Sequence, residues 1–385
     1  MDLFEELGVR KIINAEGTRT YLGGSVPDLR VMEAMKEASQ NFVVMMELLE
    51  KAGQIIAEVT GAEAGMVTSG STAALVLGMA ACIMRDSELE KFEVQPVEKL
   101  SFDKEWLDII QKLPKISRVR SEIIIQKAHR VPYYHAFLVA GSKLVVIGTR
   151  KDCSHAELEA AINENTAAIA FTAHKENVGV PLKKVVEIAS RYDIPVIVDA
   201  AAELPPRDNL RRYIAEGADL VVFSGGKQIS GPNNTGILCG RRDLIKLATL
   251  QAAPYRGIGR SMKVDRTQIV GLIVALRLWL EKDEKVEFEA WRAKARWIAN
   301  ELKGAPSVLR SEVFVEKQRS RVYVHITLDE KNGLSAADLV LNLRLGDPSI
   351  WVTYKRSNKI QINTSTLKDG EEKIVVSALK KMLSE

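Results

Sequence analysis

The most informative run of the sequence is Asp219-Leu220-Val221-Val222-Phe223-Ser224-Gly225-Gly226-Lys227. An apolar run bounded by glycines predicts a buried strand, and Lys227 then stands just past its carboxyl end. Ligands of open α/β sheets bind at that edge, where glycines let the backbone pass close to a bulky ligand. A lysine partly removed from water has a lowered pKa, so its free amine can attack an aldehyde. Surface lysines after strands are also common, so this stretch alone does not establish a catalytic site.

A second apolar strand, Pro195–Asp199, ends in an acid. A carboxylate at this edge can keep a pyridinium nitrogen protonated, which makes the ring an electron sink. The methyl group of Ala201, two residues on, can lie flat under such a ring. Taken alone, Asp199 could equally cap the following helix. Adjacent parallel strands would bring Asp199 and Lys227 to one crevice, so the pair is more specific than either residue.

A third segment predicts an anion site at the start of an apolar helix. Free N–H groups, the helix dipole and small hydroxyl residues converge there on a phosphate. Ser224 is a plausible further phosphate ligand, and a plain Ser/Thr cap is the alternative interpretation. Together with the acid and the lysine, the segment predicts a pocket for pyridoxal 5'-phosphate. Nucleotide binding fits worse, because the chain has no GxxxxGK[ST] and no GxGxxG after a strand. The predicted phosphate residues are Ser69, Gly70, Ser71 and Thr72.

Histidines supply weaker signals. His129 follows the predicted strand Glu122–Gln126, and its imidazole could stack on the other face of the cofactor ring. An isolated histidine at a strand end is more often structural, but within this constellation we favour stacking. His174 is a weaker candidate for contact with cofactor or substrate. We interpret the remaining histidines as structural: His135, His155 and His325.

The middle of the chain alternates apolar strands with amphipathic helices, which predicts a mainly parallel sheet covered on both faces. Thr235–Cys239 is expected to return antiparallel at the edge of this sheet. The later part mixes long helices and short strands, as in a smaller α+β domain. We therefore expect an N-terminal arm at 1–14, a large α/β domain at 15–265 with a surface insertion at 86–120, and a small C-terminal α+β domain at 266–385.

Composition narrows the function classes. The 385 residues carry 54 basic and 50 acidic side chains, a net charge of +4 without the basic stripe of a charge-driven nucleic-acid binder. No apolar stretch approaches the length of a membrane span. Cys82, Cys153 and Cys239 show no paired spacing, so we expect neither a metal site nor a disulfide framework. The acidic N-terminus does not resemble a secretion signal, and we expect a cytoplasmic protein.

Several runs resemble the bacterial L-seryl-tRNA(Sec) selenium transferase superfamily. The similarity is nearest to the branch of D-glucosaminate-6-phosphate ammonia-lyase and archaeal selenium-transferase-like proteins, and it covers nearly the whole chain. The runs are Ile13-Asn14-Ala15-Glu16-Gly17-Thr18, Leu22-Gly23-Gly24-Ser25, Thr60-Gly61-Ala62-Glu63-Ala64-Gly65, Val198-Asp199-Ala200-Ala201-Ala202-Glu203-Leu204-Pro205-Pro206 and Phe223-Ser224-Gly225-Gly226-Lys227-Gln228-Ile229-Ser230-Gly231-Pro232.

The resemblance implies a fold type I enzyme, similar to aspartate aminotransferase, that acts as a homodimer or higher homo-oligomer on the Cα–H bond of an amino acid. Lys227 would form the internal aldimine and move the Cα proton, and Asp199 would pair with the pyridinium nitrogen. Arg260 and Lys263 would bind an anionic substrate group or the neighbouring subunit's cofactor phosphate; a solvated basic loop is the alternative. Arg356 is a candidate for the substrate carboxylate.

One departure from the family concerns tRNA. The selenium transferase carries an extra N-terminal domain that recognises its tRNA, whereas here the shared Ile13-Asn14-Ala15 motif begins almost at once. We therefore expect no tight tRNA binding, but a lyase or β-replacement enzyme for a small anionic amino acid. The alternatives are selenium or sulfur transfer to an aminoacyl-tRNA and a non-catalytic pyridoxal-phosphate-binding protein. Transamination and racemisation use the same carbanion and stay open, as does the identity of the substrate.

Overall fold

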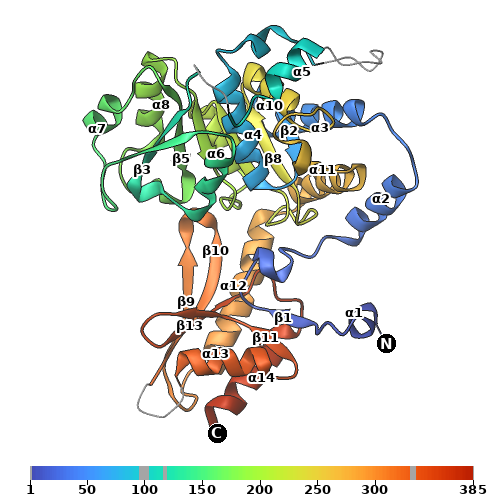
Figure 1. The fold of residues 1–385 in the computed structure, drawn as a ribbon. Coiled ribbons are helices and arrows are strands. Elements are labelled where there is room, and N and C mark those ends of the chain that lie inside the picture. The colour runs from blue at the N-terminus through green and yellow to red at the C-terminus, as the bar shows by residue number, and fades with distance from the viewer. Residues whose placement is uncertain (1, 95–103, 116–118, 330–334, 385) are drawn as a thin grey trace. The chain divides into compact units, whose positions relative to one another are not determined.

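The computed structural model describes residues 2–94, 104–115, 119–329 and 335–384. The chain forms two compact units (Figure 1). Unit 2 is continuous, Val26–Leu280, and unit 1 combines Met1–Ser25 with Glu281–Glu385. Within the described ranges, no helix has the length and apolar character needed to cross a bilayer.

This division differs from the expected bounds at both ends. The N-terminal residues are not a separate arm, because β1 (Ile12–Asn14) pairs in parallel with β11 (Ser349–Trp351) and Ala15 is buried in the core of unit 1. At the other boundary, α11 (Arg266–Glu281) belongs to unit 2, since Leu272 and Leu276 pack in its core. Sequence patterns do not reveal which core a helix at a boundary joins.

A seven-stranded sheet forms the centre of unit 2. All neighbouring strands run parallel except β8, which is antiparallel to both β2 and β7, so the predicted mainly parallel sheet with an antiparallel returning strand is confirmed. The expected edge position of this returning strand is wrong, because β2 pairs on its outer side and is itself the edge strand. In spatial order the strands are β2 (Ala64–Thr68), β8 (Gly236–Gly240), β7 (Leu220–Ser224), β6 (Val196–Asp199), β5 (Thr166–Thr172), β3 (Glu122–Gln126) and β4 (Lys143–Ile147).

Helices cover both faces of this sheet because alternate strand residues point to opposite sides. Val222 packs in one core and Val221 in the other. The first face carries α4 (Ser71–Met84), α5 (Lys104–Ile110), α6 (His135–Val139) and α10 (Arg242–Gln251). The second carries α2 (Leu29–Ser39), α3 (Met45–Thr60), α7 (His155–Ala160), α8 (Leu182–Arg191), α9 (Asn209–Ala215) and α11. Helix α4 is apolar on every side and is buried from Ala73 to Met84.

Unit 1 is an antiparallel sheet with helices packed on one face. Val324 on β10 and Ile362 on β13 point into this helix-covered core. The strands, in spatial order, are β12 (Thr353–Lys355), β13 (Lys359–Asn363), β10 (Arg321–Leu328) and β9 (Val308–Glu316), and the packed helices are α12 (Glu284–Glu301), α13 (Ala336–Leu345) and α14 (Glu371–Ser384). The short helix α1 (Leu3–Glu6) buries none of its residues. Short 3-10 helices lie at Thr20–Leu22, Glu88–Lys91, Lys127–His129, Pro132–Tyr134, Ala173–Lys175, Arg260–Met262 and Lys317–Arg319.

The segment expected as a surface insertion at 86–120 is partly core. Residues 95–103 and 116–118 lie outside the described residues. In the described part, Ile109, Ile110 and Leu113 are buried against α4, α6 and α10. The backbone at Pro114 also packs tightly on Gly141, whose missing Cβ would lie 2.5 Å from the Pro114 carbonyl oxygen. The charged residues hid this buried face from the sequence analysis, since only a short helix carries it.

Replacing Ile110 by alanine should therefore destabilise the protein. The side chain is fully buried, and removal of such a group costs about 2–5 kcal/mol because it leaves a cavity. The measurement is the midpoint of denaturant-induced unfolding. Gln111→Ala, an exposed neighbour, is the control and should change stability by about 0.5 kcal/mol or less. Equal midpoints for the two variants would show that the segment is surface after all.

Candidate active site

Strand pairing brings the predicted site residues to one edge of the sheet, the one formed by the carboxyl ends of its parallel strands. Gly236, the first residue of β8, pairs with Thr68 on one side and with Ser224 on the other. Asp199 pairs with Val222 of β7 and with Thr172 of β5. The carboxyl ends of β2, β7, β6 and β5 therefore lie along one edge, where ligands of such sheets bind.

Helix α4 begins at this edge, directly after β2. Its N-cap is Gly70, with φ of 113°, a conformation that favours glycine and leaves the first helical N–H groups without a side-chain cap. Ser69 and Ser71 are half-buried and Thr72 is exposed. A helix start with uncapped N–H groups and neighbouring hydroxyls suits a phosphate, as the sequence predicts.

Gly225 and Gly226 serve a different purpose from the predicted one. A Cβ at Gly225 would lie 2.2 Å from Thr235 Oγ1, and one at Gly226 would lie 2.4 Å from Asn233 Cα. The glycines thus let the chain's own returning segment pass close to the strand end, and a bulky ligand is not needed to explain them. Lys227 follows in a turn and is half-buried.

The carboxylate of Asp199 is buried at the end of β6. Its Oδ1 accepts a hydrogen bond from the Ala201 N–H at 3.1 Å. Burial raises the pKa of Asp199, and the hydrogen bond from Ala201 and the positive charge of Lys227 oppose this rise only in part. A cationic ring nitrogen beside Asp199 would add the missing favourable charge. The environment of this acid therefore fits a pyridinium partner.

His129 occupies a different environment from the one expected. Its ring is fully buried and packs edge-on against Phe171, with ring centroids 4.7 Å apart and planes at 64°. Nδ1 accepts the Thr172 N–H at 3.2 Å, and Nε2 donates to the Val178 carbonyl oxygen at 2.9 Å. Burial lowers the pKa of His129, which favours this neutral form. The expected stacking does not fit, because the ring has no exposed surface to offer a cofactor.

A buried polar group that was not predicted from the sequence lies beside Asp199. The hydroxyl of Tyr134 is hydrogen-bonded to Thr172 Oγ1, which in turn donates to the His129 carbonyl oxygen at 2.7 Å. Burial raises the pKa of Tyr134, and the negative charge of Asp199 adds to the rise. The only sequence signal was the polar Thr172 at the end of an apolar strand in register with Asp199.

The predicted basic residues occupy three exposed positions. Arg260 and Lys263 lie on the segment between α10 and α11 in unit 2. Arg356 belongs to unit 1, in the turn between β12 and β13. Ala201 is half-buried and donates its N–H to Asp199, and His174 is exposed in the turn after β5.

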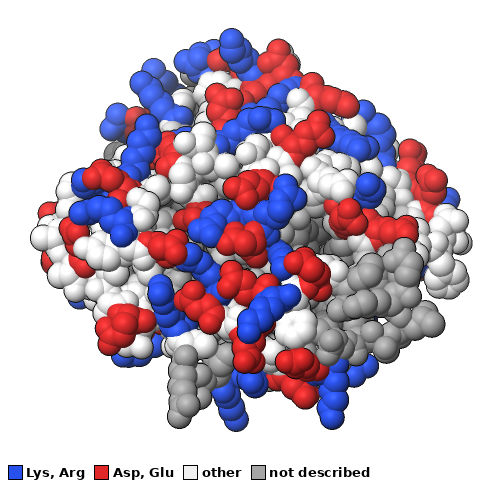
Figure 2. Space-filling view, turned by 90° about the horizontal axis from the view of Figure 1, so that it is seen from above, with Lys and Arg blue, Asp and Glu red and all other residues white. Residues whose placement is uncertain are grey.

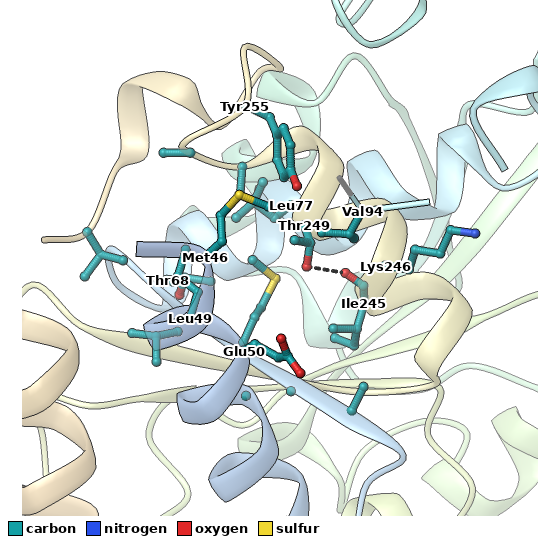
Figure 3. Close-up of a pocket in the computed structure, with 18 of the residues that line it drawn as sticks. Met46, Leu49, Glu50, Thr68, Leu77, Val94, Ile245, Lys246, Thr249 and Tyr255 are labelled. Carbon is teal, nitrogen blue, oxygen red and sulfur yellow. Dashed lines mark hydrogen bonds between the residues drawn. The ribbon is translucent and has the colours of Figure 1, made fainter. Parts of the chain in front are cut away.

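A cavity of about 860 Å³ lies beside β2, the edge strand of the sheet (Figure 3). Helices α3 and α10 and the segment 252–264 form its walls. Its lining mixes apolar side chains such as Met46, Leu77 and Tyr255 with charged ones, which include Glu47, Glu50, Glu63 and Lys246. Thr68, which precedes the predicted phosphate segment, and Lys263 also line it. The cavity thus connects the strand that leads into α4 with one of the predicted anion-binding residues.

Comparisons with known proteins agree with this arrangement. The family model of L-seryl-tRNA selenium transferase (SelA) matches residues 115–290. A 5'-C-glycyluridine monooxygenase-decarboxylase from a Streptomyces species is 30% identical over 97% of this chain and 90% of that protein. A D-glucosaminate-6-phosphate ammonia lyase from Salmonella typhimurium is 28% identical over 99% and 98% of the two chains. A solved D-glucosaminate-6-phosphate ammonia-lyase superposes with a TM-score of 0.84 at 26% identity, covering 100% of this chain and 98% of that one.

The chain belongs to the selenium transferase-like family of fold type I enzymes, which depend on pyridoxal phosphate. It is a pyridoxal-phosphate-dependent enzyme of the lyase or transferase class. The residues present fit this cofactor: uncapped N–H groups for its phosphate, a buried acid in need of a cation, and a lysine share one sheet edge.

Without cofactor, Asp199→Asn should be more stable than the wild type at pH 7. Because the folded-state pKa of Asp199 is raised, the unfolded chain loses its proton first as pH rises above about 3.9. Folding stability therefore falls between the unfolded and folded pKa values and stays reduced above both. Asparagine has no charge that burial could penalise. The difference in free energy of unfolding between the variant and the wild type should therefore become smaller on acidification toward pH 4.

The measurement is thermal unfolding of the cofactor-free proteins at several pH values. Asp108→Asn removes a charge from an exposed position and serves as the control, with little expected change. A less stable Asp199→Asn variant at pH 7 would mean that the charge of Lys227 outweighs burial.

Proposed function

We propose that the enzyme acts on a β-hydroxy α-amino acid that carries an anionic group, by α,β-elimination as an ammonia-lyase or by β-replacement. The observation that carries this proposal is the shared sheet edge of the phosphate segment, Asp199 and Lys227. The compounds for which the relatives are named support this substrate class. Glucosaminate 6-phosphate, glycyluridine and a seryl group all bear a hydroxyl on the carbon next to the amino-bearing carbon.

Each residue at the edge has a distinct task in this proposal. Bound pyridoxal phosphate supplies an electron sink for the bond that breaks at Cα. Asp199 keeps the ring nitrogen protonated, and Ala201 lies against the ring. Lys227 holds the cofactor and moves the Cα proton. The phosphate is held by the start of α4 and by the hydroxyl groups of Ser69, Ser71, Thr72 and Ser224, with Gly70 as the N-cap.

The two outcomes differ after the β-hydroxyl leaves. In a lyase, water completes the reaction and ammonia and a keto acid are released. In a replacement enzyme, an incoming nucleophile adds at Cβ. Both need the Cα proton to leave while the substrate is oriented, and a positive group to hold its anionic part. We assign the binding of the anionic part to Arg260 and Lys263, of which Lys263 lines the cavity beside β2. We assign the binding of the substrate carboxylate to Arg356.

Two other activities are candidates because relatives perform them. The Streptomyces relative is named a monooxygenase-decarboxylase, so consumption of oxygen and release of carbon dioxide form the second candidate. Selenium or sulfur transfer to an aminoacyl-tRNA is the third, on the strength of the family match. Mixed charge argues against tRNA, since Figure 2 shows basic and acidic side chains interspersed over the face it displays.

We also propose that the enzyme is located in the cytoplasm. All three cysteines are buried and free, a state that a reducing compartment maintains.

A substrate screen tests the proposed chemistry. D-Glucosaminate 6-phosphate, its unphosphorylated form and β-substituted amino acids would be assayed for ammonia, keto acid, carbon dioxide and oxygen uptake. We expect ammonia and keto acid from a phosphorylated β-hydroxy amino acid. Borohydride reduction should fix the cofactor on the peptide containing Lys227, and Asp199→Asn should lose nearly all turnover, because an amide cannot hold the ring nitrogen protonated.

Lys127→Ala, an exposed lysine at the end of β3, is the control and should keep its activity. Cofactor fixed on another lysine, or near-normal turnover in Asp199→Asn, would contradict the assignment of the site. Carbon dioxide release with oxygen uptake would favour the second candidate function.

We further propose that the enzyme is a homo-oligomer. Six large apolar side chains between residues 26 and 44 are exposed, from 42% at Val44 to 98% at Phe42. An apolar surface of this kind on a soluble domain marks an interface. A second copy of the chain is the expected partner for this surface, because a twofold axis would bring the same residues of both subunits into contact. The segment leads along the chain to Met46, which lines the cavity beside β2. The six residues are Val26, Leu29, Met32, Phe42, Val43 and Val44.

Phe42→Asp should therefore dissociate the oligomer. The substitution removes the most exposed apolar side chain of this surface. Each new carboxylate would also lose water when the subunits associate, even where Arg266, whose guanidinium lies 5.6 Å from the Phe42 ring centroid, pairs with it. Sedimentation velocity at micromolar concentration gives the readout, together with activity. Leu309→Asp, at an exposed position of β9 in unit 1, is the control. A fully active wild-type monomer would refute the proposal.

A further inference from the structure

Gln251, the last residue of α10, is a fully buried amide that joins three segments. Its Oε1 accepts the Ile258 N–H at 3.1 Å, and its Nε2 donates to the Ile110 carbonyl oxygen at 3.4 Å. Its own carbonyl oxygen accepts the Gly259 N–H at 2.9 Å. One side chain therefore links α10, the segment after it, and the segment that contains α5.

The segment at 252–264, the basic loop, carries exposed Arg256, Arg260 and Lys263. Its inner side is buried, with Tyr255 in the same apolar core as α4. The basic loop leaves no room around Gln251: a Cβ at Gly257 would lie 2.5 Å from Gln251 Oε1 and 2.7 Å from Gln251 Cα. The loop is thus shaped directly against this glutamine.

A buried amide is stable only when its donors and acceptors are used, and here both ends of the side chain have partners. The acceptor of its N–H group is the carbonyl oxygen of Ile110, the last residue of α5. The Gln251 side chain is therefore hydrogen-bonded on one side to the segment expected as a surface insertion and on the other side to the basic loop. Ile110 and Leu113 are buried, which holds that segment in place.

We propose that Gln251 is a positioning residue, which ties the 104–114 segment to the basic loop and so holds Arg260 and Lys263 where they select an anionic substrate group. The inference rests on the proposed function, in which these two residues meet that group. Among the described residues, Gln251 makes no hydrogen bond to the side chain of Arg260 or Lys263, and it acts through the backbone N–H groups of Ile258 and Gly259. A glutamine that merely fills the core would be replaceable by an apolar side chain of similar size.

Two variants test this proposal from opposite sides of the contact. Gln251→Met keeps the length of the side chain and removes both hydrogen bonds. Gly257→Ala keeps Gln251 and pushes the basic loop away from it. The control is Gln111→Met, an exposed glutamine one residue beyond the carbonyl group that Gln251 binds. All are prepared as holoenzyme.

Two measurements report on the loop and on its task. The first is the rate of trypsin cleavage after Arg256, Arg260 and Lys263, which we expect to rise about tenfold in both variants, as the loss of a buried hydrogen bond allows. The second is the ratio of kcat/KM for D-glucosaminate 6-phosphate to that for D-glucosaminate. We expect this ratio to fall about tenfold through KM, with kcat and the absorption spectrum of the bound cofactor unchanged. Gln111→Met should match the wild type in both.

Unchanged cleavage in both variants would overturn the proposal, and so would faster cleavage with an unchanged substrate ratio. A wild-type enzyme that shows no preference for the phosphorylated compound would contradict the anion-binding part of the proposed function instead. The protease result would then still decide whether Gln251 holds the loop.

Discussion

A carboxylate buried at the end of a central strand is unstable unless a cation stands beside it, and the site depends on this constraint. Asp199 has one hydrogen bond, from Ala201, and its pKa stays raised despite the charge of Lys227. The ionised form of this acid would therefore gain from a further positive charge. A protonated ring nitrogen would supply that charge, so the same environment favours the cofactor in its electron-withdrawing form.

The position of Asp199 follows from the sheet. Parallel strands direct their carboxyl ends to one edge, and the antiparallel β8 lets β2 join them, since Gly236 pairs with both Thr68 and Ser224. The helix after β2 then starts next to the lysine strand. Phosphate segment, acid and lysine come from strands far apart in the chain, and a shared edge is the simplest arrangement that unites them.

Around this edge, buried amide and hydroxyl groups hold the loops in place. Gln126 binds both the N–H and the carbonyl group of Val180, His129 binds Val178, and Gln251 binds the basic loop. Each lies in an apolar core where an unused donor or acceptor is costly, so each fixes one loop conformation. The rigid edge and these tethered loops together define where a substrate can lie.

The parallel sheet, the cofactor and the three local groups proposed to bind it could be predicted from the sequence, because each is carried by a short contiguous run: an apolar strand followed by Ser-Gly-Gly-Lys, a strand ending in Asp199, and a helix starting after Ser69-Gly70. Tertiary packing set the surroundings of those runs. It buried His129, which was expected to stack on the cofactor, assigned Gly225 and Gly226 to contacts with the chain itself, placed β2 at the edge of the sheet, and put Ile110 in the core. The physical reason is that burial and hydrogen bonding at these positions depend on partners distant in sequence, such as Val178 for His129 and Gln251 for the Ile110 carbonyl group, and no local pattern records them.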